Sequence, residues 1–110
     1  MSRDAQGTVH AFMNMCLHRG VPVAEGCGNT TEFSCPYHAW RFGPDGKCDD
    51  IPGLRGPIPK AACVRSWPVH ESLGAIWVWH DSEGGAPEWD PPSLPEWADP
   101  SWVHWRLDDL

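Results

Sequence analysis

Two short segments each join one cysteine to one histidine, and they constrain this 110-residue chain more than any other feature. The first reads CLHRG at residues 16–20 and the second reads CPYHAW at residues 35–40. Their spacing is C-x-H in the first case and C-x-x-H in the second. Thiolate and imidazole groups are ligands for transition metals in proteins, so the pattern predicts a metal site. The four candidate ligands are Cys16, His18, Cys35 and His38.

A single zinc ion matches this pairing poorly. Zinc sites of two cysteines and two histidines usually segregate as C-x2–4-C and H-x3–5-H, and a C-x-H pair is too short for the usual knuckle turn. Coincidence is also disfavoured, because two such pairs occur, each on a loop rich in Gly, Pro and Arg. A [2Fe–2S] cluster with two cysteines on one iron and two histidines on the other explains the mixture, since each loop then supplies one ligand to each iron.

The composition narrows the class of protein. Five cysteines is an odd number, which suits metal ligation in a reducing compartment better than a disulfide framework. The net charge of -7 disfavours a nucleic-acid partner, and the eight Lys and Arg residues are scattered singly. The longest apolar run is residues 75–79, so we expect no transmembrane helix, and the start has no signal-peptide pattern. We therefore expect a cytoplasmic protein with no membrane partner.

The pattern of residues predicts a small antiparallel β domain. Twelve Pro and eleven Gly favour short strands and turns over long helices. Alternating hydrophobicity and β-branched residues predict strands at residues 8–15, 32–34, 39–42, 63–70 (broken by Pro68) and 75–80. Turns are expected at residues 3–7, 43–47 and 71–74, and an irregular loop at residues 51–59. The turn at residues 3–7 has almost nothing before it to serve as a partner strand.

The amino-acid composition of the chain changes from residue 81 onward. Residues 81–105 contain five prolines and four tryptophans without a clean periodicity. Flexible linkers generally lack aromatic residues, so we expect this tail to lie against another surface. Eight tryptophans in all indicate a core or a docking surface built from large rings.

CLHRG and CPYHAW resemble the ligand loops of Rieske iron–sulfur proteins, and in particular of Rieske-type non-haem iron oxygenases. The phrases CPYHAWRFGPDGKC…IPG and VRSWPVHESLGAIWVW also resemble that family, so the likeness covers most of residues 3–80. The resemblance implies that Cys16 and Cys35 ligate one iron of a [2Fe–2S] cluster, and that His18 and His38 ligate the other.

The resemblance also favours one branch of the family. Respiratory-chain Rieske proteins carry an extra cysteine in each loop, and the two are joined as a disulfide. Val21 and Tyr37 stand in those places here, which favours the oxygenase or ferredoxin branch. We accordingly expect residues 1–80 to form the Rieske [2Fe–2S] domain, with N-terminal strands missing, and residues 81–110 to form a Pro/Trp-rich connection towards an absent catalytic domain.

Several residues beside the ligands are candidates for a supporting role. Gly20 suits close approach of the backbone to an inorganic sulfide. Arg19 has two interpretations. It either tunes the reduction potential of the cluster or pairs with a carboxylate, or it is a solvated surface residue. Tyr37 is read either as a hydrogen-bond donor to a cysteine sulfur or as packing beneath the loop, and Trp40 as chiefly structural. We expect no ligand role for the other thiols and imidazoles, which are Cys27, Cys48, Cys63, His10, His70, His80 and His104.

Two functions follow from the resemblance. An oxygenase α subunit hydroxylates or demethylates an aromatic or similar apolar substrate with O2, whereas a stand-alone Rieske ferredoxin only carries electrons. The oxygenase needs a mononuclear Fe(II) site, which the family places on a D/N-x2-H-x3–4-H helix, and no such motif occurs here. Because the tail resembles the connection to a catalytic domain, we favour a fragment of an oxygenase α subunit, truncated at both ends. The resemblance implies a reductase or ferredoxin donor fed by NAD(P)H, and other α subunits in the intact oligomer.

Overall fold

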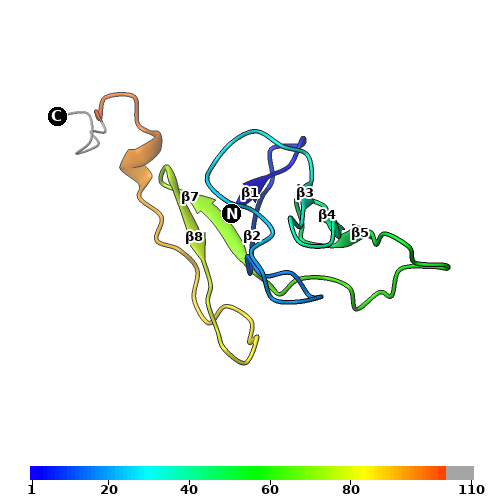
Figure 1. Cartoon of the computed structure of the whole chain (residues 1–110). Helices are drawn as coiled ribbons and strands as arrows, with labels where there is room; N and C mark the ends of the chain where they lie inside the picture. The colour runs from blue at the N-terminus through cyan, green and yellow to red at the C-terminus, as the bar shows by residue number, and fades with distance from the viewer. Residues whose placement is uncertain (104–110) are drawn as a thin grey trace.

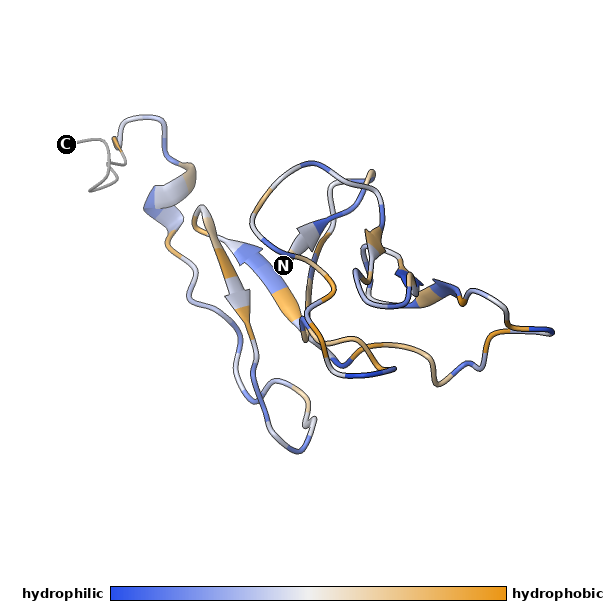
Figure 2. Cartoon of the chain, viewed as in Figure 1, coloured by the Kyte–Doolittle hydropathy of each residue, from blue (hydrophilic) through white to orange (hydrophobic). Residues whose placement is uncertain are grey.

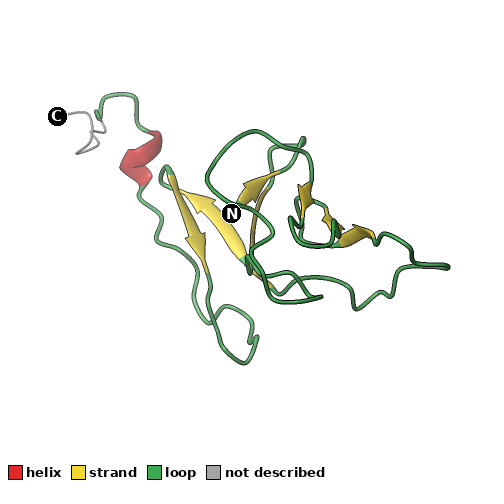
Figure 3. Ribbon diagram, in the orientation of Figure 1, coloured by secondary structure: helices red, strands yellow, loops and turns green. Residues whose placement is uncertain are grey.

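The architecture is described from a computed structural model of the chain, in which residues 1–103 are described. Within residues 1–103, eight short strands and one 3-10 helix follow one another, and several of the connections between them are long loops (Figures 1 and 3). The small antiparallel β architecture expected from the sequence is confirmed. The elements are β1 Ser2–Arg3, β2 Val9–Phe12, β3 Phe33–Ser34, β4 Arg41–Phe42, β5 Cys48–Asp50, β6 Ser66–Trp67, β7 Val69–Ser72, β8 Ala75–Val78 and η1 Pro95–Ala98.

The strands form three small antiparallel sheets. One has the order β1-β2-β6, a second has the order β3-β4-β5, and β7 pairs with β8 as a hairpin. In Figure 1 the β3-β4-β5 sheet and the β7–β8 hairpin lie on opposite sides of β2. The first Cys/His loop (residues 16–20) follows β2, and the second Cys/His loop (residues 35–40) connects β3 to β4.

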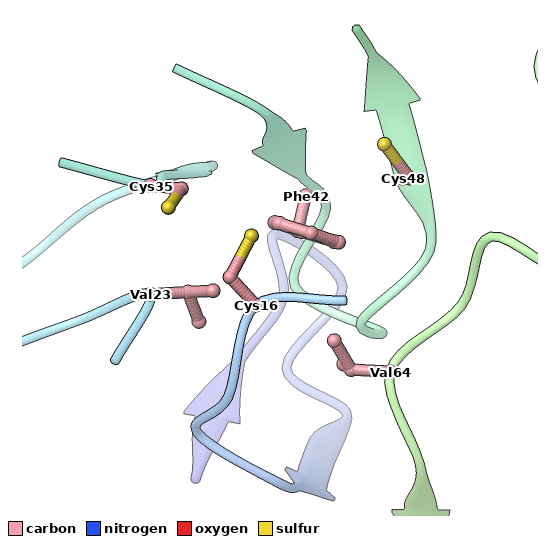
Figure 4. Close-up of a cluster of buried hydrophobic side chains, with 6 residues drawn as sticks. All are labelled: Cys16, Val23, Cys35, Phe42, Cys48 and Val64. Carbon is pink, nitrogen blue, oxygen red and sulfur yellow. The ribbon is translucent and has the colours of Figure 1, made fainter. Parts of the chain in front are cut away.

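The buried core is small and contains two of the candidate ligands. Cys16 and Cys35 extend from different loops into a cluster that Phe42 and Val64 complete (Figure 4). Phe42 is 0 % exposed, and its position in β4 places it directly after the second Cys/His loop. The core therefore packs directly behind both loops. Its buried members are Cys16, Val23, Cys35, Phe42, Cys48 and Val64.

Most of the predicted strands are present, with shorter bounds. The alternation in residues 8–15 yields β2, whose Val9 and Ala11 are buried while the two residues between and after them are half-buried. Pro68 breaks the predicted strand at residues 63–70 into β6 and β7, because proline has no N–H for the ladder. The turn at residues 3–7 does have a partner strand, β1, although this strand has only two residues.

One tryptophan of the tail contacts the β7–β8 hairpin, although most of residues 82–103 are exposed. The ring of Trp89 contacts Trp77 and Trp79 edge-on, with centroid separations of 6.4 and 6.0 Å. Trp77 lies on β8 and Trp79 directly follows that strand, which carries much of the hydrophobic colour near the tail in Figure 2. Trp89 therefore attaches the tail to the hairpin. His104 and the end of the predicted connection lie outside the described residues.

No helix within residues 1–103 has the length and apolar character needed to span a membrane.

Candidate metal centre

The first Cys/His loop is a tight turn closed by two backbone hydrogen bonds. The N–H of Cys16 donates to the carbonyl oxygen of Val21 at 2.8 Å, and the N–H of Gly20 donates to that of Cys16 at 2.8 Å. Gly20 has a φ of 71°, in the left-handed region where a residue without Cβ is favoured. The turn buries the cysteine to 2 % exposure and leaves His18 exposed.

The second Cys/His loop has the same backbone closure. The N–H of Cys35 donates to the carbonyl oxygen of Trp40 at 2.8 Å, and the N–H of Ala39 donates to that of Cys35 at 2.9 Å. As in the first loop, the partners lie five and four residues after the cysteine. The position four residues on is again left-handed, but here Ala39 adopts it, with a φ of 57°. The two loops are therefore matching turns despite their different C-x-H and C-x-x-H spacing.

The four donor side chains divide into two pairs. The thiols of Cys16 and Cys35 are neighbours in the core, close enough to share a hydrogen bond (Figure 4). The rings of His18 and His38 meet in an edge contact at the surface, with centroids 4.5 Å apart and planes at 60°. Within residues 1–103, no three His, Cys, Asp or Glu side chains are grouped around one ion position. The arrangement is a thiol pair inside and an imidazole pair outside.

The protein surroundings affect the two thiols differently. Burial raises the pKa of the Cys16 thiol, and the N–H of His18 opposes this rise by hydrogen bonding to the sulfur. At Cys35 burial also acts to raise the pKa, but hydrogen bonds from the N–H groups of Tyr37 and His38, together with one from the Cys16 thiol, outweigh it and lower the net pKa. Each loop thus directs backbone N–H groups at its own sulfur, which stabilises the thiolate that a metal requires.

The surroundings of His18 favour the neutral imidazole, which is the form that binds metal. Partial loss of hydration, followed by the nearby charges of His38 and Arg19, lowers the pKa of His18. A neutral imidazole has a free nitrogen lone pair for a metal, whereas a protonated ring has none. The electrostatics therefore favour ligation at His18.

Aromatic rings flank the imidazole pair on both sides. The ring centroids of Tyr37 and His38 are 3.8 Å apart, and the ring planes meet at 37°. Tyr37 is 61 % exposed. Tyr37 therefore lies over the surface rather than beneath its loop. On the other side, Trp40 lies parallel to His18, at 6° and 5.3 Å between centroids, and packs against the core.

One supporting residue was missed in the sequence. The side-chain amide of Asn14 binds the segment that follows the first Cys/His loop. Its Oδ1 accepts from the N–H groups of Val23 and Ala24 at 2.9 and 3.0 Å, and its Nδ2 donates to the Ala24 carbonyl at 2.7 Å. A polar residue two positions before a candidate ligand cysteine was the available signal.

The three other thiols, of Cys27, Cys48 and Cys63, differ from one another in exposure. Cys27 is exposed on the loop before β3, and Cys63 is half-buried in an isolated bridge with Lys47. Cys48 is buried on β5, where burial above all raises the pKa of its thiol. In Figure 4 the ring of Phe42 lies between Cys48 and Cys16.

The comparison with protein families identifies the chain. The family described as the Rieske [2Fe–2S] domain matches residues 1–68, which include both Cys/His loops. The chain therefore belongs to the Rieske [2Fe–2S] domain family, and a [2Fe–2S] cluster is the cofactor that defines that family. The donor set fits this cofactor, because two thiols and two imidazoles are the ligands of a mixed-ligand cluster.

Similar proteins include an oxygenase component and a desaturase, both of which are longer than this chain. The 3-ketosteroid-9-alpha-monooxygenase oxygenase component of Mycobacterium tuberculosis is 38 % identical over 107 residues, which is 94 % of this chain and 27 % of that protein. The cholesterol 7-desaturase of Bombyx mori is 41 % identical over 98 residues, or 84 % of this chain and 21 % of that protein. The chain thus spans about a quarter of the length of these relatives.

Solved structures that resemble this chain are also longer than it. Dicamba monooxygenase superposes with a TM-score of 0.69 and 33 % identity, covering 90 % of this chain and 32 % of that one. Naphthalene 1,2-dioxygenase superposes with a TM-score of 0.67 and 31 % identity, covering 78 % of this chain and 20 % of that one. The fold of this chain is therefore that of one segment of these oxygenases.

Proposed function

We propose that the two Cys/His loops hold a [2Fe–2S] cluster and that the chain transfers single electrons. In this assignment Cys16 and Cys35 ligate one iron, and His18 and His38 ligate the other. The observation that carries it is the matched backbone closure of the two loops, which brings the thiols together inside and the imidazoles together outside. Two like turns facing each other suit a cluster of two irons, each of which takes one ligand from each loop.

A cluster with two imidazole ligands accepts one electron at a higher potential than a four-cysteine cluster, because neutral imidazoles replace two thiolates. The protein's own contribution is to keep water from the thiol pair and to leave the imidazole pair accessible. Cys16 and Cys35 are 2 % and 3 % exposed, whereas His18 and His38 are both exposed. The histidine edge is therefore the side through which an electron enters or leaves.

We infer that the chain acts as the Rieske part of an oxygenase that hydroxylates or demethylates an aromatic or similar apolar substrate with O2. The oxygenase relatives support this function over that of a stand-alone Rieske ferredoxin, the second candidate. The whole enzyme requires a mononuclear Fe(II) site outside these 110 residues, and a reductase or ferredoxin donor fed by NAD(P)H. Other α subunits complete the proposed oligomer. The coding sequence downstream of residue 110 tests this: a D/N-x2-H-x3–4-H motif is expected, and an immediate stop codon favours the ferredoxin.

We also propose that residues 81–110 form the connection between the Rieske domain, residues 1–80, and a catalytic domain. The contact of Trp89 with Trp77 and Trp79 supports a tail that is attached to the domain but is not part of its core. Trp89→Ala should speed proteolysis within residues 81–103 while leaving residues 1–80 resistant. Trp102→Ala, at a similarly exposed ring, is the control. Equal proteolysis of both variants and the wild type would contradict this proposal.

The cluster itself is tested by anaerobic reconstitution of the full chain with ferrous iron and sulfide. We expect a brown protein with two irons per chain and the EPR spectrum of a mixed Cys/His cluster after reduction. His38→Cys should change that spectrum, whereas His70→Ala, on strand β7, should not. A colourless protein that binds one zinc ion and no iron would refute the assignment.

A further inference from the structure

The second Cys/His loop supports the histidine of the first loop. Trp40 belongs to the second loop, and its carbonyl oxygen closes that loop by accepting from the N–H of Cys35. Its ring, however, lies against His18 of the first loop, nearly parallel at 6° and with centroids 5.3 Å apart. This offset parallel contact joins the two loops through an aromatic pair.

The two histidines are supported unequally. Trp40 is half-buried and packs against the core cluster, so its ring is fixed from behind. His38 contacts Tyr37, which belongs to its own loop and is 61 % exposed. His18 therefore rests on an anchored surface, and His38 rests on a side chain that is itself in solvent.

A fixed ring limits the orientations of an imidazole. Hydrogen-bonding partners that orient metal-ligating histidines change metal affinity by roughly 10–100-fold when they are removed. A packed ring restricts the same rotation of the imidazole. The same ring keeps water from one face of His18, and exposure to solvent is one of the factors that set the potential of an iron–sulfur site. Both effects depend on the contact between Trp40 and His18 and on no hydrogen bond.

We propose that Trp40 is a positioning residue, which orients the His18 imidazole for iron and shields it from water. This inference rests on the proposed cluster site. Removal of the Trp40 ring has two consequences. The cluster is released faster, because His18 is free to turn away. The potential becomes more positive, because reduction adds a negative charge to the site and additional water stabilises that charge.

The first experiment uses the apo form of the full chain, with no metal. NMR of the histidine side chains should show His18 ring protons shifted upfield by the ring current of Trp40. Trp40→Leu should abolish this upfield shift, and Trp40→Phe should keep part of it because a planar ring remains. The Phe variant also decides the matter if the Leu variant fails to fold.

The second experiment uses the reconstituted chain. Trp40→Leu should release iron to a ferrous chelator about tenfold faster than the wild type and show a more positive reduction potential. Trp40→Phe should restore most of both values. Trp67→Leu is the matched control, because Trp67 is also half-buried and lies against a histidine, His80, that is outside the loops. It should leave release and potential unchanged.

Two outcomes separate this inference from the function on which it rests. A wild-type chain that takes up no cluster overturns both the proposed function and the positioning role. A loaded wild type whose Trp40→Leu variant keeps the same His18 shifts, release rate and potential overturns the positioning role alone. Equal effects of Trp40→Leu and Trp67→Leu would also overturn it, since they would reflect general loosening of the domain.

Discussion

Asn14 binds Ala24 at both polar atoms of its backbone. The amide Nδ2 of Asn14 donates to the carbonyl of Ala24 at 2.7 Å, and the Oδ1 accepts from the N–H of Ala24 at 3.0 Å. A third bond, from the N–H of Val23, completes the contact. Asn14 precedes the first Cys/His loop and Val23 follows it. Because Val23 is a core residue, these bonds connect the segment before the loop to the core.

Replacement of Asn14 should therefore destabilise the domain. Asn14→Ala removes three hydrogen bonds from partly hydrated groups and should lower the free energy of unfolding by about 1–2 kcal/mol. Asn14→Asp keeps the acceptor but places a carboxylate against the Ala24 carbonyl, so it should also destabilise. Urea unfolding of the apo chain measures both values. An unchanged urea midpoint for Asn14→Ala would show that the contact is not important for stability.

The matched loops allow a reciprocal substitution. Gly20 and Ala39 occupy equivalent left-handed positions, with φ of 71° and 57°. A left-handed backbone costs a residue with a Cβ about 1–2 kcal/mol. Gly20→Ala should therefore destabilise by about 1 kcal/mol, since its Cβ would meet only Met15 atoms at the ordinary distance of 3.9 Å.

Ala39→Gly relieves the same strain in the second loop. Glycine also loses more backbone entropy on folding, and this difference reduces the loss at Gly20 and the gain at Ala39 alike, so the expected gain is up to about 1 kcal/mol. Thermal unfolding of the two single variants and of the double variant measures both effects. Destabilisation by Ala39→Gly would show that the entropy of the unfolded chain outweighs the strain.

A second pair of glycines separates strain from steric overlap. Gly46 and Gly53 share a φ of 81°, but a Cβ on Gly46 would lie 2.6 Å from Val64 Cγ2, whereas at Gly53 it meets no atom within 4 Å. Gly53→Ala should cost about 1 kcal/mol, from the backbone alone. Gly46→Ala should cost at least about 2 kcal/mol more, because Val64 is in the core and cannot move freely. Denaturant unfolding should show this order, and equal losses would contradict it.

The β class could be predicted because local sequence patterns indicate it, and a local pattern also selected the candidate ligands. The spacing of Cys and His identified the four candidates, and alternation identified β2. The common closure of the two loops could not be predicted, since it depends on hydrogen bonds to residues five positions away. Ala39 concealed it further, because alanine gives no sign of a left-handed backbone.

Strands without a hydrophobic pattern were the other omission. β5 has the sequence CDD, and only Cys48 is buried. It is held by pairing with β4 and by the bond from Cys48 N–H to the Ala62 carbonyl at 2.8 Å, both of which are tertiary contacts. β1 was overlooked for a similar reason, because a strand of two residues is too short to show a hydrophobic periodicity. Its position depends on pairing with β2.

The β7–β8 hairpin has a turn that its sequence does not favour. Leu73 and Gly74 form the two-residue connection, with φ of 56° and 67°. A turn with two left-handed residues favours Asn-Gly, because asparagine tolerates this conformation better than leucine. Leu73→Asn should stabilise the chain by up to about 1 kcal/mol, and Leu73→Val should destabilise it. A thermal melt in which both variants unfold below the wild type would show that packing of Leu73 outweighs the turn.

Acid should weaken the turn at residues 43–47. The ammonium group of Lys47, hydrogen-bonded to Asp45 at 2.6 Å, holds the pKa of that carboxyl below its ordinary value of 3.8, with a further bond from the Lys47 N–H. A carboxyl whose pKa is lower in the folded state binds protons more tightly when unfolded. Its contribution to stability is thus complete above the ordinary pKa and is lost as the pH falls through the folded value.

Asp45→Asn should therefore reduce stability at neutral pH and flatten its decline below about pH 4. Lys47→Ala removes the larger part of the same interaction, so the double variant should lose less than the sum of the two single losses. Urea midpoints of the apo chain, measured from neutral pH downward, provide the test. A decline with pH that is as steep in Asp45→Asn as in the wild type would assign the acid sensitivity to other carboxyls, such as Asp4, whose pKa is lowered first by its bond to His10.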